Sequence, residues 1–195
     1  MGPNVEDECR EVEGRIRALP AVAVAALAVG AAQRLMARYL STSGTAGSAF
    51  VAGWSTALST LWDALALPTP GRKRALEKYL EDYYCGPYCH ELGSSALPGA
   101  DEDAAAAAIY ALEAYCNQNK DSGLAAARRL VDAADQAADA QTEASGEDLM
   151  SEDAQLRRDR FARREIDRIN SAVDVLDSAG VTSASLQGLR GVFAR

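Results

Sequence analysis

The sequence has one histidine, four cysteines, six prolines and few aromatic residues, which make up 6% of its 195 residues. Metal, redox or thiol chemistry would therefore have to involve the segment from Cys85 to His90, which holds two of the cysteines and the histidine. A helical di-metal site is excluded, because such sites use Glu-x-x-His motifs and the residue three positions before His90 is Pro87. No alternation of polar and apolar residues predicts a β-strand.

A long hydrophobic run is also missing. The longest, residues 18–32, is mostly alanine and valine and falls short of the about 20 residues that span a bilayer. A secretory signal peptide begins with positive charge, whereas the segment before this run carries Glu6, Asp7, Glu8, Glu11 and Glu13. We therefore expect a cytoplasmic protein without membrane contact, in which the cysteines are free thiols.

Positive charge is in the minority, with 20 basic against 28 acidic residues and a formal net charge of −8. This balance argues against nucleic-acid binding, which usually needs a clustered basic surface. It favours a basic protein partner, because charges of opposite sign steer association.

Alanine is abundant, at 40 residues. It is the best helix former, and its small side chain lets helices approach closely. We expect an all-α fold with a single domain over residues 1–195, built as a bundle of seven to eight helices. Residues 1–19 should contain an N-terminal helix, and residues 142–153 should form an acidic surface loop.

The spacing of apolar residues and of helix-capping residues gives the expected helix boundaries. The expected helices cover residues 5–19, 20–39, 49–67, 72–84, 102–116, 122–140, 151–177 and a last segment from 183. The clearest pattern is a 4-3-4-3 repeat in the seventh of these helices, which predicts a seam buried in the bundle. It consists of Ala162, Ile166, Ile169, Val173 and Leu176.

The Cys85-x3-Cys89-His90 segment can be interpreted as a metal site. Zinc takes about four ligands, and only one close group is present here unless Cys9 or Cys116 completes the set. A thioredoxin-like redox motif has two residues between its cysteines, whereas this segment has three.

We favour a structural interpretation of the same segment, in which Gly86 and Pro87 end a helix. Cys85 and Cys89 then pack as small hydrophobic groups, as free cysteines commonly do. His90 has no identifiable nucleophile or orienting partner, so the sequence assigns no catalytic residue, no metal ligand and no cofactor.

Charged residues recur at helical spacing in two segments. Asp132, Asp135 and Asp139 are interpreted as a solvated helix face. Further along lies an arginine ridge at 3-4-4 spacing, which could bind phosphate or an acidic partner. It consists of Arg157, Arg160, Arg164 and Arg168. Interleaved acidic residues dilute this ridge, so we expect it to be an ordinary helix surface, with docking as the alternative.

Five residues are interpreted as structural anchors: Arg34, Tyr39, Trp62, Asp63 and Asp101. Arg34 lies one helical turn before Arg38, and we expect it to pair with Asp63 or with an acidic residue at the start of the helix that Asp101 caps.

The order Gln33-Arg34, Tyr39 and Leu61-Trp62-Asp63 resembles the bacterial "domain of unknown function 416" family of helical proteins. An acidic helix start followed by Ala-Ile-Tyr-Ala-Leu, and a late Leu189-Arg190, fit the same pattern. The chain departs from that pattern at Gln33, where the family has Glu, and at Arg38, where it has Asn. The segment from Cys85 to His90 has no counterpart in the pattern. The resemblance implies an all-helical domain and transfers no catalytic residue.

From these observations we expect a non-catalytic interaction protein, in its most specific form an immunity-type inhibitor that binds a basic toxin or enzyme. One alternative is a small metal- or thiol-dependent enzyme centred on Cys85, Cys89 and His90. The other is a regulatory module that docks through the arginine ridge. The sequence leaves the oligomeric state open.

Overall fold

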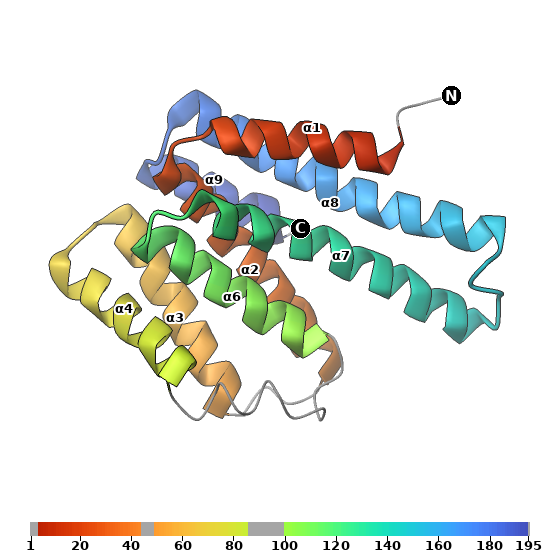
Figure 1. Cartoon of the computed structure of the whole chain (residues 1–195), viewed down its shortest axis with the longest axis horizontal. Coiled ribbons are helices and arrows are strands. Elements are labelled where there is room, and N and C mark those ends of the chain that lie inside the picture. Colours follow the sequence, from red (N-terminus) through yellow and green to blue (C-terminus); the bar gives the residue numbers. More distant parts are fainter. Residues whose placement is uncertain (1–3, 44–48, 86–99, 195) are drawn as a thin grey trace.

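A computed structural model describes residues 4–43, 49–85 and 100–194, and within these ranges it contains eight α-helices and no β-strand. The predicted all-α fold is confirmed (Figure 1). The helices are α1 (Val5–Ala18), α2 (Ala21–Ser43), α3 (Ala49–Ala66), α4 (Pro70–Cys85), α6 (Ala100–Cys116), α7 (Lys120–Ser145), α8 (Glu152–Ala179) and α9 (Ser183–Ala194).

Helix α2 is the core of the bundle. It packs most extensively against α6 and α7, and it also contacts α3, α8 and α9. Every residue from 23 to 32 is buried. By length and composition the segment Ala21–Ser41 could cross a membrane, although the run at residues 18–32 looked too short to do so. Its position among five other helices accounts for this apolar character.

Helices α7 and α8 form a long antiparallel hairpin, with α1 lying along α8 (Figure 1). The seam predicted for α8 is confirmed, because all five of its apolar residues are buried. The acidic loop predicted at residues 142–153 is shorter than expected. Helix α7 continues to Ser145, where Gly146 ends it in a left-handed conformation with φ of 72°. Thr142 is fully buried within the helix, not in a surface loop.

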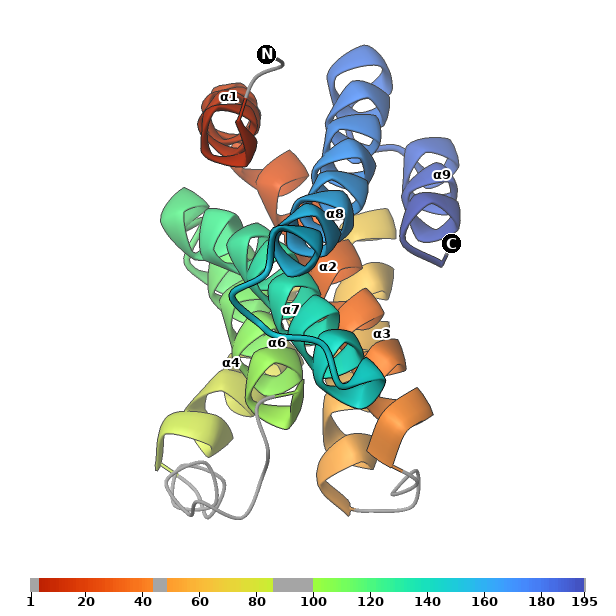
Figure 2. The same ribbon diagram turned by 90° about the vertical axis from the view of Figure 1, so that its right-hand side faces the viewer.

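Two glycines set how closely other helices approach α2. A Cβ atom on Gly30 would lie 2.2 Å from Cδ2 of Phe193, so the ring of α9 rests directly on the α2 backbone. A Cβ atom on Gly123 would lie 2.3 Å from Cγ1 of Val24, which brings α7 equally close. Figure 2 shows α9 held beside both α2 and α8, the arrangement that forms the site described below.

Candidate functional site

A cavity of about 840 Å³ lies where α2, α7, α8 and α9 meet. Its most distinctive feature is the charge of the side chains that line it. Five of them are arginines, namely Arg34, Arg38, Arg164, Arg168 and Arg190. Glu165 is the one carboxylate among the described lining residues, so the lining carries a net charge of +4. This is a concentrated positive site in a protein of net charge −8.

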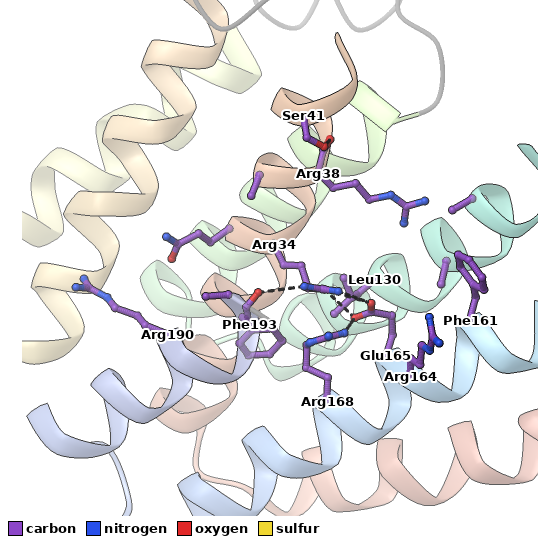
Figure 3. A pocket seen from close by; sticks show the side chains of 15 residues that line it. Arg34, Arg38, Ser41, Leu130, Phe161, Arg164, Glu165, Arg168, Arg190 and Phe193 are labelled. Carbon is purple, nitrogen blue, oxygen red and sulfur yellow. Dashed lines mark hydrogen bonds and ion pairs between the residues drawn. The ribbon is translucent and has the colours of Figure 1, made fainter. Parts of the chain in front are cut away.

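The Glu165 carboxylate is held between two of these arginines (Figure 3). Arg34 donates from Nε to Oε2 at 2.9 Å and from Nη2 to Oε1 at 2.8 Å, which is a bidentate ion pair between α2 and α8. Arg168 donates from Nη1 to Oε2 of the same carboxylate. The glutamate side chain is only 11% exposed, so three charged groups are packed together with little water.

The same two arginines fasten the end of α9. Arg34 Nη1 donates to the Phe193 carbonyl at 3.3 Å, and Arg168 Nε donates to the Val192 carbonyl at 3.2 Å. These carbonyls belong to the last turn of α9, where helix hydrogen bonding leaves acceptors available. Arg34 and Arg168 therefore act first as structural groups that join α2, α8 and α9.

The other three arginines are arranged differently. Arg164 and Arg190 are exposed, and each guanidinium lies over an aromatic ring, at 5.7 Å from the centroid of Phe161 and 4.9 Å from that of Trp62 respectively. Arg38 is partly buried, and burial is the main cause that lowers the pKa of its guanidinium. The negative charges of Glu165 and Asp103 oppose this shift, and nearby Arg34 adds to it.

The predicted arginine ridge is divided by the fold. Arg164 and Arg168 line the cavity, whereas Arg160 is exposed elsewhere on α8. Arg157 pairs with Glu147 at 2.9 Å and donates to Thr142 Oγ1 at 2.8 Å, which ties the α7–α8 hairpin together.

The structure buries or pairs some of the five predicted anchor residues and leaves Asp63 exposed. Arg34 is an anchor, but its partner is Glu165, and within the described residues no ion pair joins it to Asp63, which is exposed. Tyr39 and Trp62 are buried, and Trp62 Nε1 donates to Gln33 Oε1 at 2.6 Å. Helix α6 begins at Ala100, so Asp101 lies within its first turn and is not the residue before it.

Most of the cysteine segment lies outside the described residues, which include neither Cys89 nor His90, and Cys85 is described only as the last residue of α4. Cys116 is buried, and this burial raises its pKa to about 11. Its thiol is therefore protonated at neutral pH and is a poor metal ligand. Among the described residues, no group of three or more His, Cys, Asp or Glu side chains could hold a metal ion.

The acidic face of α7 is more crowded than a solvated face would be. Asp139 pairs with Arg158 at 2.5 Å. The pKa of Asp135 is raised, mainly by burial and then by the negative charges of Asp132 and Asp139.

Sequence reasoning did not find the cavity. One signal was present: α2 and α8 each carry two arginines four residues apart, Arg34 with Arg38 and Arg164 with Arg168. Residues four apart share a helix face, so two such pairs form one site only if the two faces meet. Gln33 and Arg38, two of the positions at which the chain departs from the pattern that it resembles, both line the cavity.

Comparison with known proteins supports the fold. No family model matches the sequence, and no curated protein matches it. Among solved structures, the chain is similar to the crystal structure of a DUF416 family protein from Shewanella baltica, with a TM-score of 0.66 over 93% of this chain and 92% of that one. The two sequences are 20% identical. The resemblance to this family that the sequence predicted is thus confirmed in the fold.

Proposed function

We propose that this protein is a non-catalytic binding protein, and that its arginine-lined cavity holds an anionic group of a small molecule or of a protein partner. The observation that supports this most is the presence of five arginines and one carboxylate around a single cavity. Guanidinium groups bind phosphate and carboxylate oxygens through paired N–H donors. Like charges gathered in a partly buried site repel one another, and a bound anion would relieve that repulsion.

Binding is favoured over catalysis by the kinds of residues present. The described lining residues include no histidine, cysteine or lysine. Their one carboxylate, Glu165, is engaged by two arginines. Their one hydroxyl, that of Ser41, donates to the backbone carbonyl of Arg38 at 2.7 Å. A nucleophile with a base in reach, the minimum for covalent chemistry, is not among these groups. The docking alternative from the sequence is kept in part, since Arg164 and Arg168 belong to the predicted ridge.

The test is calorimetric titration of inorganic phosphate at low ionic strength, where screening is weak. A variant with Arg38→Gln and Arg164→Gln should bind phosphate at least tenfold more weakly, because each lost charge-assisted hydrogen bond contributes about 1.5–3 kcal/mol. Arg160→Gln is the matched control, since it removes the same charge from an exposed position of α8 that does not line the cavity. The proposal fails if the wild type does not bind phosphate, or if the control weakens binding as much as the double variant.

An inhibitor of a basic protein remains the second candidate. It is favoured by the net charge of −8 and by the crowded carboxylates of Asp132, Asp135 and Asp139 on α7. An Asp132→Asn, Asp135→Asn variant tests it with polylysine as the probe. Loss of polylysine binding in this variant, with phosphate binding unchanged, would favour the acidic face over the arginine-lined cavity as the partner surface.

A further inference from the structure

A second cavity adjoins the arginine-lined one. It has a volume of about 350 Å³, lies between α2, α3 and α9, and shares Gln33, Ala37 and Arg190 with its larger neighbour. Two cavities that share three lining residues can hold two parts of one ligand. Their volumes are in the range of small-molecule sites in proteins.

The chemistry of the second cavity differs from that of the first. Met36, Leu58 and Trp62 contribute apolar, mostly buried side chains, while Ser55 and Ser59 are exposed hydroxyl residues. The Trp62 ring is 3% exposed, lies beneath the Arg190 guanidinium and donates its indole N–H to Gln33, so a ligand meets the exposed guanidinium and not the ring face. This combination suits a flat aromatic group with polar edges.

Arg190 connects the two environments. Its guanidinium lies over the Trp62 ring, and it lines both cavities. Figure 3 shows Arg190 on one side of the Arg34–Glu165 pair and Arg164 on the other, so the larger cavity extends from Arg190 to Arg164. A ligand that fills both cavities must therefore carry its anionic group at a distance from its aromatic group. Ala37 lies between them with only a methyl group, which leaves room for a linking group.

We propose that the two cavities together form a binding site for a free nucleoside phosphate, with the base on the Arg190 guanidinium that covers Trp62, the sugar over Ala37 and the phosphate among the arginines. This inference rests on the proposed function, which requires only that an anion bind the larger cavity. The lining charge of +4 suits a phosphate group, which carries nearly two negative charges, better than a single carboxylate. Stacking on an aromatic ring or a guanidinium suits a nucleobase because every base has a π face.

The experiment compares adenosine monophosphate, ribose 5-phosphate and adenosine, each titrated into the full chain. The first two share the phosphate and sugar, so the difference in their affinities measures the base. Adenosine monophosphate should bind at least tenfold more tightly than ribose 5-phosphate, a difference of about 1.4 kcal/mol. Adenosine alone should bind more weakly than either phosphate.

An Ala37→Leu variant separates the two cavities. Ala37 is exposed, so a larger side chain should be accepted there, and it would occupy the passage between the cavities. We expect it to abolish the preference for adenosine monophosphate over ribose 5-phosphate. Ala75→Leu, at an exposed position of α4 outside both cavities, should change neither.

The outcomes distinguish the two proposals. Equal affinity for the two phosphates, or an unchanged preference in Ala37→Leu, would overturn the nucleotide assignment and leave anion binding standing. Tighter binding of adenosine than of ribose 5-phosphate would also overturn it, because the base alone would then account for recognition. Failure of both phosphates to bind would overturn the proposed function together with this inference.

Discussion

The ring of Phe193 lies on the backbone of Gly30, so closely that a methyl group at this glycine would come within 2.2 Å of the ring. This contact holds α9 against α2, and α9 supplies Arg190 and the carbonyl that Arg34 binds. The shape of the arginine-lined cavity therefore depends on the absence of a side chain at one position of the core helix.

Gly30→Ala should weaken both the fold and the site. Overpacking of a filled core typically costs about 1–3 kcal/mol, and displacement of α9 should reduce phosphate affinity as well. Urea unfolding and phosphate titration measure the two effects. Gly191→Ala, in α9, is the control, because nothing lies within 4 Å of its added Cβ. It should leave stability unchanged or raised by up to about 1 kcal/mol. Equal effects of the two variants would contradict the role of the Gly30 contact.

Glu165→Gln should change stability and affinity in opposite directions. Loss of one partner from a buried ion pair costs about 3–5 kcal/mol, since Arg34 and Arg168 would be left facing each other. The same change removes the one negative charge among the described lining residues, so phosphate should bind more tightly and should restore part of the lost stability. Thermal unfolding with and without phosphate measures both.

Asp167→Asn is the control for that experiment, since it removes a carboxylate from an exposed position of α8 outside the cavity. It should leave phosphate affinity nearly unchanged. Weaker phosphate binding in Glu165→Gln would show that the carboxylate organises the site for the anion and does not compete with it.

Much of the fold follows from local patterns in the sequence. The spacing of Ala162, Ile166 and Ile169 predicts the buried face of α8 because a helix repeats every 3.6 residues. The site could not be predicted in the same way. Arg34 and Glu165 are 131 positions apart in the sequence. The spacing of residues around each of them does not indicate which other helix it will contact.

The arginine ridge shows the same limit. Arg160 and Arg164 are equivalent by spacing, yet one is exposed outside the cavity and the other lines it. Arg164 lines the cavity and Arg160 does not because only part of α8 lies next to α2 and α9. The expected partner of Arg34, either Asp63 or an acidic residue at the start of α6, was wrong for this reason, since Glu165 comes from a helix much later in the chain.

Asp103 should make stability depend on pH. Its side chain is 2% exposed and pairs with Arg129 at 2.9 Å, while its Oδ2 has no hydrogen-bond partner among the described residues. Burial raises its pKa above the ordinary value of 3.8, and Arg129 opposes the shift only in part. The folded state therefore holds the proton more tightly than the unfolded state does. Stability should fall as pH rises from about 3.8 through the raised pKa, and the contribution should be constant above it.

The measurement is urea unfolding over a pH series for the wild type and for Asp103→Asn. The difference between their free energies of unfolding should shift in favour of the variant as pH rises through this window. Asp177→Asn, at an exposed position near the end of α8, serves as the charge-matched control. A pH-independent difference between the wild type and Asp103→Asn would contradict the raised pKa.

The thiols of Cys9 and Cys116 should differ in reactivity. Cys116 is 8% exposed with a pKa raised to about 11, whereas Cys9 is only partly buried. Thiol titration of a variant with Cys85→Ser and Cys89→Ser isolates these two. Cys9 should react first in the native state, because the thiolate is the reactive form and burial keeps the Cys116 thiol protonated. Both thiols should react promptly in urea, where unfolding exposes them. Simultaneous reaction in the native state would show that α6 does not protect Cys116.

The most direct test of the central claim is an NMR titration of the arginine side-chain Nε–Hε signals with inorganic phosphate. Binding in the cavity predicts saturable shifts for Arg38 and Arg164, with little change at Arg10 and Arg160, which are exposed and lie outside it. Equal shifts at all four arginines, or none at Arg38 and Arg164, would contradict an anion-binding cavity at the junction of α2, α7, α8 and α9.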